Sequence, residues 1–336
     1  MILVTGGAGY IGSHFVVYLI KHGFEVLVID NFSNSNHSNI KNIEKIVGSN
    51  INFIEGDVKD CSILNQIFRR YKISSVAHFA GFKSIPNSII NPISYYSENI
   101  ISSISILESM EQAGIKKIIF SSSASVYGNS HPLPWHEGLN LEFPLNPYAQ
   151  TKYITEKFLI NICNIDKDFR VGILRYFNPI GYHESGLIGD SIKNNENNLI
   201  PAIIRVLLRL DENFNIFGND YLTKDGTGIR DYIHIDDLIS GHVAALKYIN
   251  LNKGLNIWNL GKGTGYSVHE IISEFENRLV TKIPFVIKER RKGDLPEYWS
   301  EVSKAYSELN WSANRNLNEM IVSTINRINY LKETNF

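Results

Sequence analysis

The strongest constraint on the fold lies at the start of the chain, where a short apolar run at 2–5 leads directly into a glycine-rich turn with Gly6, Gly9 and Gly12. Apolar residues then repeat at helical spacing until Gly23, a typical helix stop. A strand, a tight turn and a helix in this order are typical of a dinucleotide-binding unit. The glycines there permit close approach to a diphosphate, and the helix N-terminus supplies amide donors. A structural turn without a ligand is the alternative.

Short apolar runs alternate with helical patterns through the first half of the chain. Predicted strands lie at 2–5, 25–30, 52–55, 75–79, 117–121 and 171–176. This alternation predicts an α/β fold with a doubly wound, parallel, Rossmann-like sheet. Two longer amphipathic segments, 92–113 and 147–165, carry more apolar surface than one sheet face needs. They form either a dimer interface or a second packing layer.

The texture of the sequence changes after Asn178, where loops rich in glycine, asparagine and proline separate shorter elements at 199–210 and 297–309. This change predicts a smaller α/β lobe. A helix at 231–248 and a strand at 255–260 are expected to return to the first sheet. The predicted division is therefore 1–177 with 231–262 for the dinucleotide-binding domain, and 178–230 with 263–336 for the substrate-binding lobe. The asparagine-rich stretches 31–42 and 194–198 are predicted to be loops.

Composition narrows the class of partner. The chain has 33 basic and 34 acidic residues in 336, a formal net charge of -1, which argues against nucleic acid or a membrane surface and favours a small molecule. Its two cysteines, Cys61 and Cys163, are far apart and form no metal-binding motif, so no metal is expected. No apolar run approaches the roughly 18 residues of a membrane span. These features favour a cytoplasmic enzyme.

Two carboxylates follow the predicted strands of the first half. Asp30 ends the second strand, eighteen residues beyond Gly12, where a carboxylate accepts hydrogen bonds from the adenosine ribose and repels a 2'-phosphate. This position favours NAD over NADP. Asp57 ends the third strand and is placed either to meet the adenine edge or to cap the following turn.

Tyr148 and Lys152 are four residues apart in a predicted helix, so their side chains project from one face. A nearby ammonium, together with the positive ring of an oxidised nicotinamide, favours the charged form of a phenol and lowers its pKa. Tyr148 is therefore a candidate general base for redox chemistry. Taken alone, this spacing is common by chance.

The glycine turn, the serines at 121–123 before Val126-Tyr127-Gly128, and the Tyr148/Lys152 pair together resemble the extended short-chain dehydrogenase/reductase family. Within it, the chain is similar to the UDP-glucose 4-epimerase family, in one collinear order from residue 4 to residue 309. The segments that carry this resemblance are 30–31, 78–81, 174–179, 197–199, 216–221, 225–234 and 293–296.

The resemblance implies roles for individual residues. Tyr148 would be the base, Lys152 its pKa tuner and ribose anchor, and Ser123 a hydrogen-bond partner of the reacting hydroxyl. The implied NAD site comprises Gly6, Gly9, Tyr10, Ile11, Gly12, Asp30, Asn31, Asp57, Val58, Phe79, Ala80, Lys83, Asn99, Tyr148, Lys152 and Phe177. The implied UDP-sugar pocket comprises Ser123, Tyr148, Asn178, Asn198, Leu199, Phe217, Arg230, Tyr232, Arg291, Asp294 and Tyr298. Arginines suit diphosphate oxygens, and an aromatic gives a uracil a packing face.

The implied activity is reversible inversion at carbon 4 of UDP-galactose and UDP-glucose, by a homodimer. Proton removal by Tyr148 and hydride transfer to the nicotinamide would give a 4-keto sugar. The sugar then has to present its other face, which requires firm anchoring of UDP and looser contact with the hexose. NAD has to stay bound throughout. Tyr298 is expected to wall the pocket near carbon 2 and to favour sugars without an N-acetyl group.

Three alternatives remain open on sequence grounds. A nucleotide-sugar 4,6-dehydratase usually has Asp-Glu after its catalytic hydroxyl residue, whereas Ala124 and Ser125 follow Ser123 here. A UDP-glucuronic acid decarboxylase needs cationic recognition of a sugar carboxylate, which the sequence does not identify. A non-catalytic NAD-sensing protein on the same scaffold is the third alternative, because a fold does not imply chemistry.

Overall fold

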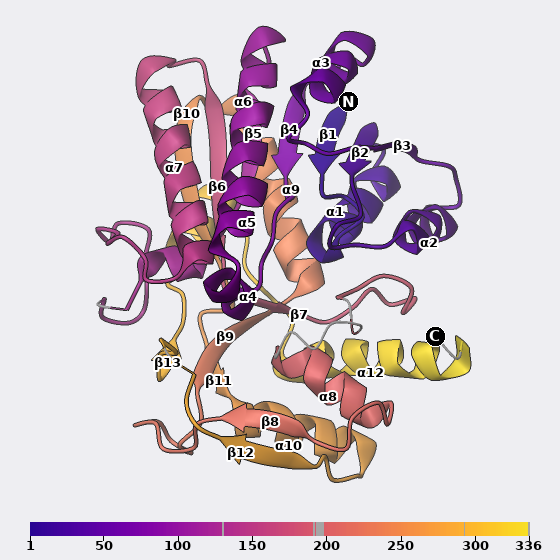
Figure 1. The fold of residues 1–336 in the computed structure, drawn as a ribbon, viewed down its shortest axis with the longest axis vertical. Helices are drawn as coiled ribbons and strands as arrows, with labels where there is room; N and C mark the ends of the chain where they lie inside the picture. Colours follow the sequence, from indigo (N-terminus) through magenta and orange to yellow (C-terminus); the bar gives the residue numbers. More distant parts are fainter. Residues whose placement is uncertain (130, 191, 193–197, 292, 335–336) are drawn as a thin grey trace.

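A seven-stranded parallel sheet forms the centre of the larger lobe in the computed structural model, which describes residues 1–129, 131–190, 192, 198–291 and 293–334 (Figure 1). In spatial order the strands are β3 (Asn52–Glu55), β2 (Val26–Asp30), β1 (Ile2–Thr5), β4 (Ser75–His78), β5 (Lys117–Ser123), β6 (Arg170–Tyr176) and β10 (Gly254–Leu260). The predicted α/β fold with a parallel sheet is confirmed. The strand order reverses between β1 and β4, and ligands bind at such switch points.

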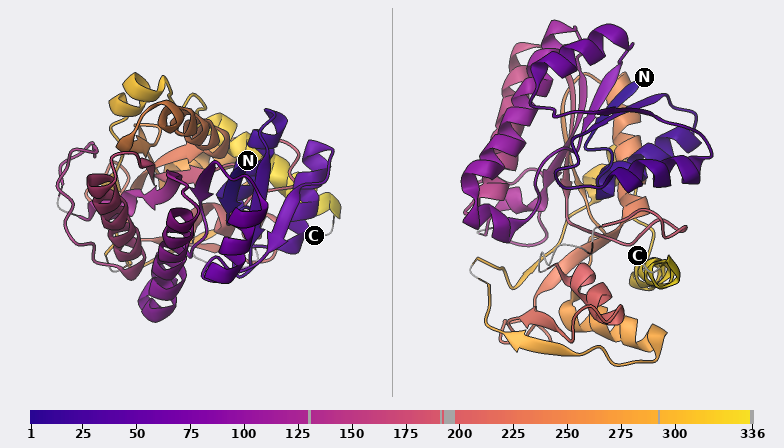
Figure 2. Two further views of the ribbon diagram at one scale, coloured as in Figure 1. Left: turned by 90° about the horizontal axis from the view of Figure 1, so that it is seen from above. Right: turned by 45° about the vertical axis from the view of Figure 1, so that its right-hand side comes forward.

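Helices cover both faces of this sheet, as the right-hand view of Figure 2 shows. Val4, Val28 and Ala77 point toward one face and pack in the core cluster that contains α1 (Tyr10–Lys21), α2 (His37–Val47) and α9 (Ile235–Leu251). Leu3 and Leu27 point toward the other face, where the helices are α3 (Cys61–Arg70), α6 (Ser102–Gln112) and α7 (Pro147–Ile165). Burial on both faces explains the continuous apolar runs of the sequence.

The loop prediction for 31–42 was wrong in part, whereas the helical prediction for 92–113 is confirmed with one irregularity. The stretch 31–42 was expected to be a loop, but α2 begins at His37, where the Asn36 side chain accepts from the backbone N–H of Ser38. Ile40, Ile43 and Ile46 repeat at helical spacing and pack on the core, which stabilises the helix despite its asparagines. The stretch 92–113 is not one regular α-helix.

The segment 92–113 is divided by a turn of π-helix. It consists of α5 (Pro92–Tyr96), the π-helical η1 (Ser97–Ile101) and α6, and it follows a short helix, α4 (Ile85–Ile90). The π-turn contains Asn99, whose buried side chain accepts from the N–H of Phe82 and donates to the Phe82 carbonyl. Such single π-turns frequently occur at functional sites.

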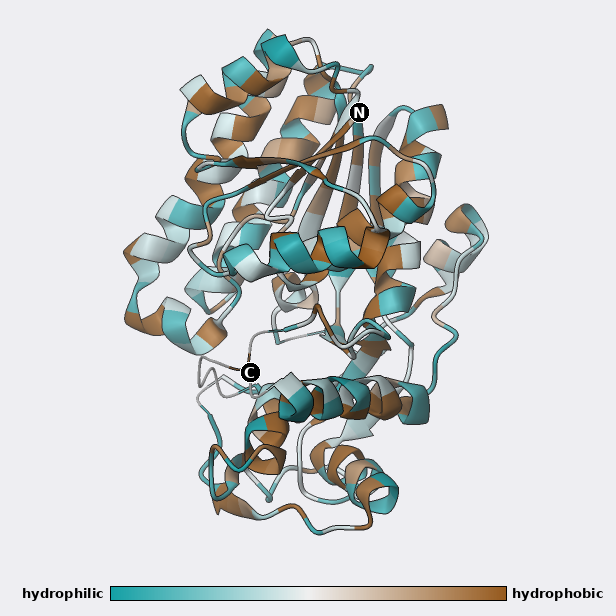
Figure 3. Cartoon of the chain, turned by 90° about the vertical axis from the view of Figure 1, so that its right-hand side faces the viewer, coloured by the Kyte–Doolittle hydropathy of each residue, from teal (hydrophilic) through white to brown (hydrophobic). Residues whose placement is uncertain are grey.

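The smaller lobe is built around β9 (Ile229–His234), which pairs with β7 (Asn178–Ile180), β11 (Gly265–Ser267) and β13 (Glu297–Tyr298). A separate parallel pair joins β8 (Phe214–Phe217) to β12 (Phe285–Lys288). The helices of this lobe are α8 (Leu199–Leu207), α10 (Val268–Leu279) and α12 (Leu317–Thr334), whereas α11 (Ser303–Leu309) packs on α9 and β10 of the larger lobe. In Figure 3 apolar residues gather in the strands of the large sheet and along the inner sides of these helices.

The segment 231–262 contributes to both lobes. Asp231 to His234 were predicted to start a helix, but they lie in β9, because strands pair with both of its edges. The helix begins only at Ile235, where the His234 side chain accepts from the N–H of Asp236. Helix α9 packs on the large sheet, and β10 is the edge strand of that sheet, next to β6. β9 therefore runs directly into an element of the other lobe.

A buried ion pair joins α7 to the sheet beneath it. The side chains of Glu156 and Arg175 are 1% and 3% exposed, and Arg175 donates from Nε and Nη2 to the two Glu156 oxygens over 3.1 and 2.7 Å. The Ser122 hydroxyl donates to the same carboxylate. Glu156 thus links α7 to β5 and β6.

Within the described part of the chain, no helix combines the length and apolar character that crossing a bilayer requires.

We predict that Glu156→Ala destabilises the fold by about 3–5 kcal/mol, because it leaves the Arg175 guanidinium buried without its counter-ion. The free energy of unfolding from urea titration measures the effect. Asp168→Ala is the matched control, because its pair with Lys253 is 60% and 57% exposed, and we expect it to change stability little. A double variant, Glu156→Met with Arg175→Met, should recover part of the loss, and equal stability of the two single variants would contradict the prediction.

Candidate active site

The N-terminal turns of α7 carry the predicted catalytic pair. Pro147 begins the helix, and the Asn146 side chain caps it by accepting from the N–H of Ala149 over 2.9 Å. The buried Lys152 ammonium donates to the Ser121 carbonyl over 2.8 Å and lies 5.0 Å from the centre of the Phe120 ring. Helix α7 therefore presents Tyr148 and Lys152 to the carboxyl end of β5.

The ionisation of this pair is shaped by burial. Burial raises the pKa of Tyr148, a hydrogen bond with Ser123 acts against this rise, and the Tyr298 phenol adds to it. Burial lowers the pKa of Lys152 to about 8, although the Glu156 carboxylate opposes the shift. At neutral pH Lys152 is therefore mostly charged and Tyr148 carries its proton. The tuning of Tyr148 by Lys152 and an oxidised nicotinamide stays a prediction.

Ser123 connects Tyr148 to the end of β5. Its hydroxyl oxygen accepts from the N–H and the hydroxyl of Ser125, over 3.2 and 2.9 Å. Ser125 belongs to the short 3-10 helix η2 (Ala124–Tyr127) that directly follows the strand. The Ser123 hydroxyl is thereby held between η2 and Tyr148, in position to share a hydrogen bond with a reacting group.

The glycine turn between β1 and α1 leaves no space for a side chain at Gly6 or Gly12. Gly6 has a φ of +68°, and a Cβ atom there would lie 2.7 Å from the backbone nitrogen of Ala80. A Cβ atom at Gly12 would lie 2.2 Å from the Gly6 carbonyl oxygen. The N-cap of α1 is Gly9, so no side chain caps the first turn. Its amides, including those of Tyr10 and Ile11, are donors suited to a diphosphate.

The carboxylates of the predicted adenosine end lie beside this turn. Asp30 ends β2 and accepts from the N–H of Ala8, the N–H of Phe32 and the hydroxyl of Ser35, each over 2.9 Å. Its oxygens retain further acceptor sites for ribose hydroxyls. Asn31 donates to Asp57 over 3.2 Å. Asp57 also accepts from the N–H of Lys59, as the capping alternative requires, and its contact with the adenine edge stays a prediction.

These observations fit a dinucleotide with its diphosphate at α1 and its adenosine ribose at Asp30. The predicted residues Phe79 and Ala80 follow β4, next to the glycine turn, and Val58 is buried after β3. Phe177 is buried beside the rings of Trp135 and Tyr298. The dinucleotide would bring its nicotinamide toward Tyr148 across the carboxyl ends of β4 and β5.

Two predicted cofactor residues make protein contacts of their own. Lys83 lies 2.6 Å from Asp190 and 5.7 Å from the centre of the Tyr10 ring. Asn99 donates to the Thr151 hydroxyl over 2.9 Å, in addition to its contacts with Phe82. Asn99 therefore fastens the loop after β4 to α7, and direct binding of the cofactor by Asn99 or Lys83 stays a prediction.

The predicted substrate residues of the smaller lobe form a cationic and aromatic group. The Arg291 guanidinium lies 3.8 Å from the centre of the Phe217 ring, and that of Arg230 lies 4.7 Å from the centre of the Tyr298 ring. Burial lowers the pKa of Arg291; Asp294 opposes this and Arg230 adds to it. The mutual influence of these charges places them in one region. Two partly buried guanidinium groups of like charge favour an anionic ligand.

The other predicted substrate residues differ in their burial and in their contacts with this group. Tyr232 is buried in β9, and burial raises the pKa of its phenol. Tyr298 adds to this rise, and the Arg230 and Arg291 guanidinium groups oppose it. Asn178 donates to the Asp231 carbonyl and accepts from the Tyr298 hydroxyl over 3.3 Å. Asn198 is exposed before α8, and Leu199 packs against the core of the smaller lobe.

Trp135 is a site residue that sequence reasoning missed. Its ring stacks on Tyr298 with centroids 5.0 Å apart and planes within 5°. The backbone of Trp135 accepts from the N–H of Glu301 and donates to the Trp299 carbonyl. Tyr298 is thus held between an indole and the Arg230 guanidinium. A lone tryptophan in a loop is the only signal in the sequence, and it carries no motif.

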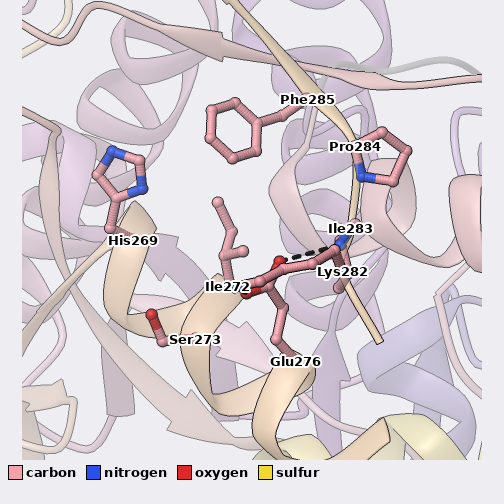
Figure 4. A pocket seen from close by; sticks show the side chains of 8 residues that line it. All are labelled: His269, Ile272, Ser273, Glu276, Lys282, Ile283, Pro284 and Phe285. Carbon is pink, nitrogen blue, oxygen red and sulfur yellow. Dashed lines mark hydrogen bonds and ion pairs between the residues drawn. The ribbon is translucent and has the colours of Figure 1, made fainter. Parts of the chain in front are cut away.

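One pocket of the structure lies apart from these groups. Figure 4 shows this open depression of about 620 Å³ between α10 and the start of β12, with His269, Ser273 and Phe285 in its lining. The predicted site residues belong to other elements. Across the described residues, no group of three or more His, Cys, Asp or Glu side chains is arranged to hold a metal ion.

Comparisons with known proteins agree with this geometry. Residues 3–324 match the family described as GDP-mannose 4,6 dehydratase. UDP-glucose 4-epimerase of Yersinia enterocolitica is 46% identical over 320 residues, and that of Bacillus subtilis is 44% identical over 322 residues; these matches cover 95% of this chain and 95% and 94% of the relatives.

Solved structures give the same result. The UDP-glucose 4-epimerase of Stenotrophomonas maltophila, with bound NAD and formylated UDP-arabinopyranose, superposes with a TM-score of 0.95 at 38% identity and 99% coverage of both chains. That of Bifidobacterium longum, in complex with NAD+ and UDP, has a TM-score of 0.94 at 40% identity and 98% coverage of both. Together with the Tyr148, Ser123 and Lys152 arrangement, these likenesses establish that the chain belongs to the UDP-glucose 4-epimerase family, within the broader family that the dehydratase profile describes.

Proposed function

We propose that this protein interconverts UDP-galactose and UDP-glucose by inversion at carbon 4, with NAD as its cofactor and no net redox change. The observation that carries the proposal is the position of Tyr148. Its phenol is hydrogen-bonded with Ser123 at the carboxyl end of β5 in the larger lobe, and its pKa is affected by Tyr298, whose ring lies 4.7 Å from the Arg230 guanidinium of the smaller lobe. A proton acceptor between a hydride carrier and an anion site suits oxidation of a sugar hydroxyl.

The chain's own residues divide the chemical work. NAD, when bound, accepts a hydride from carbon 4 and later returns it. Tyr148 takes the proton of the carbon 4 hydroxyl and gives it back, while Ser123 orients that hydroxyl. The Lys152 ammonium favours the phenolate form of Tyr148 and contacts the nicotinamide ribose. Ser121 holds the ammonium through its carbonyl, so the pair keeps its orientation through both half-reactions.

The distribution of charge supports the inversion step. Arg230 and Arg291 would grip the diphosphate, and Phe217 and Tyr232 would flank the uridine, whereas the region around Tyr148 offers the hexose mainly neutral side chains. Strong binding of one end and weak binding of the other allow the 4-keto sugar to rotate about its diphosphate linkage. The opposite face then meets the same hydride donor, and the product has the inverted configuration.

A 4,6-dehydratase is the nearest alternative, and the name of the matching family raises it again. Elimination of water across carbons 5 and 6 needs an acid and a base next to the catalytic hydroxyl residue. Here Ala124 and Ser125 occupy those positions, and Ala124 is buried in an aromatic cluster. The absence of carboxylates at these two positions favours epimerisation.

The first test is turnover of UDP-galactose by the purified protein without added NAD. We expect UDP-glucose to form without accumulation of NADH, as a coupled assay and nicotinamide absorbance would record. Tyr148→Phe should lower kcat by about 10²–10⁴-fold, because it removes the proton acceptor, while NAD and UDP still bind. Tyr153→Phe removes a hydroxyl from the same helix and is the matched control. Undiminished turnover in Tyr148→Phe would exclude the base role.

We further infer that Tyr298 excludes N-acetylated sugars. Its ring is fixed between Trp135 and Arg230, and its hydroxyl faces Asn178. Tyr298→Cys should let the protein epimerise UDP-N-acetylglucosamine, because it removes a fixed wall, whereas Tyr298→Phe retains the volume and should not. The ratio of kcat/KM for acetylated and plain sugars measures this selectivity. An unchanged ratio in Tyr298→Cys would remove Tyr298 as the gate.

We also propose that the protein is a homodimer in the cytoplasm. Helices α4 and α5 pack beside α7 and expose Ile90 and Ile93, which are 72% and 84% exposed, in an apolar face. Ile93→Lys should yield monomers in light scattering, because it buries a charge in the interface. Leu222→Lys, at a 98% exposed site of the smaller lobe, should not. Dimers of equal stability in both variants would place the interface elsewhere.

The proposed location in the cytoplasm agrees with the thiols of Cys61 and Cys163, which form no disulfide and suit a reducing compartment.

A further inference from the structure

Residues 181–190 follow β7 and cross from the smaller lobe to the edge of the larger one. Figure 1 shows this segment, here termed the strap, passing between α2 and the C-terminal helix α12. Neither the strap nor α12 contains a residue of the predicted site. The contacts of the strap nevertheless connect α12 to the predicted dinucleotide turn.

On one side, the strap is fastened to α12. Arg327 donates from Nη1 to the carbonyls of Gly186 and Leu187, and the Ser323 hydroxyl accepts from the N–H of Tyr182 over 3.3 Å. Gly186 has a φ of +68°, and a Cβ atom there would lie 2.7 Å from the Cβ of Tyr330. The chain therefore passes α12 at a distance that only glycine permits.

On the other side, the strap is fastened to elements around the predicted cofactor site. The Tyr10 hydroxyl donates to the Gly181 carbonyl over 2.7 Å. Asn42 of α2 donates to the Leu187 carbonyl over 3.0 Å, and Asp190 pairs with Lys83 over 2.6 Å. Tyr10 begins α1, whose first-turn amides are the proposed diphosphate donors. The strap thus contacts the elements that carry the proposed diphosphate donors.

The Arg327 guanidinium stabilises the contact between α12 and the strap. Burial lowers its pKa, although Tyr182 and Tyr330 oppose the shift, and its Nε atom is buried without a hydrogen-bond partner in the described part of the chain. The strap carbonyls are the hydrogen-bond acceptors of Nη1. Lifting the strap would remove both carbonyl acceptors from the Nη1 of a partly buried cation, which costs free energy.

We propose that α12, through Arg327, holds the strap across the exit of the dinucleotide site and thereby slows the release of NAD. Arg327 is a positioning residue, since it acts through the strap and touches neither cofactor nor sugar. The function of such retention follows from the proposed reaction, in which a reduced cofactor that escaped would leave a 4-keto sugar behind. The inference rests on the NAD part of the proposed function and not on the identity of the sugar.

The test is the exchange rate of bound NAD, measured on the purified holoprotein by replacement with isotopically labelled NAD. Arg327→Met should release NAD about tenfold faster, because it removes charge-assisted hydrogen bonds to the strap. Lys332→Met removes an equal charge from an exposed position of α12 and should exchange like the parent protein. Circular dichroism and thermal melting establish that each variant is folded.

Asn42→Ala provides a second route that leaves α12 intact, and it should also accelerate exchange. A folded Arg327→Met variant with the parent rate would overturn the proposal, as would equal acceleration by Lys332→Met. If Arg327→Met fails to fold, the Asn42→Ala rate decides, and a parent-like rate there overturns the proposal. Failure of the proposed sugar chemistry would instead appear as slow NAD exchange in a parent protein that does not turn over UDP-galactose.

Discussion

The buried pair of Glu156 and Arg175 is the interaction on which the geometry of the reacting groups depends. It joins α7, which carries Tyr148 and Lys152, to the strand that ends beside them. The Ser122 hydroxyl brings β5 into the same contact, so the ends of two strands and one helix share a single carboxylate. The charge of Glu156 also opposes the loss of the Lys152 proton that burial favours. This ion pair therefore affects both the position of the helix that carries Tyr148 and Lys152 and the protonation of Lys152.

The two lobes supply different kinds of chemistry to the space between them. The larger lobe offers backbone amides and carboxylates at a topological switch point, which suit a dinucleotide. The smaller lobe offers Arg230 in β9 and Arg291 after β12, two cations that favour an anion. Tyr298 belongs to the smaller lobe, yet its phenol helps to raise the pKa of Tyr148 in the larger one, so the proposed selectivity residue and the proposed base lie close enough to interact.

Sequence patterns predicted those features that depend on local spacing. The parallel sheet was predictable because strands buried on both faces leave continuous apolar runs, and the glycine turn because Gly6 and Gly12 admit no side chain. Helix α2 was missed because its asparagines masked a helical repeat of isoleucines. The stacking of Trp135 on Tyr298 and the contacts of Arg327 had no local signal, since they join residues more than a hundred positions apart.

The direct passage from β9 into α9 has a mechanical consequence. His234 ends the strand and caps the helix, so no loop separates the element that pairs in the smaller lobe from the one that packs on the large sheet. Hinge bending is absorbed by a few loop or element-terminal residues, and at this junction the side chain of His234 is engaged in capping the helix. A tilt of β9 in the smaller lobe is therefore passed directly to α9 on the large sheet, because this connection contains no loop that could absorb it.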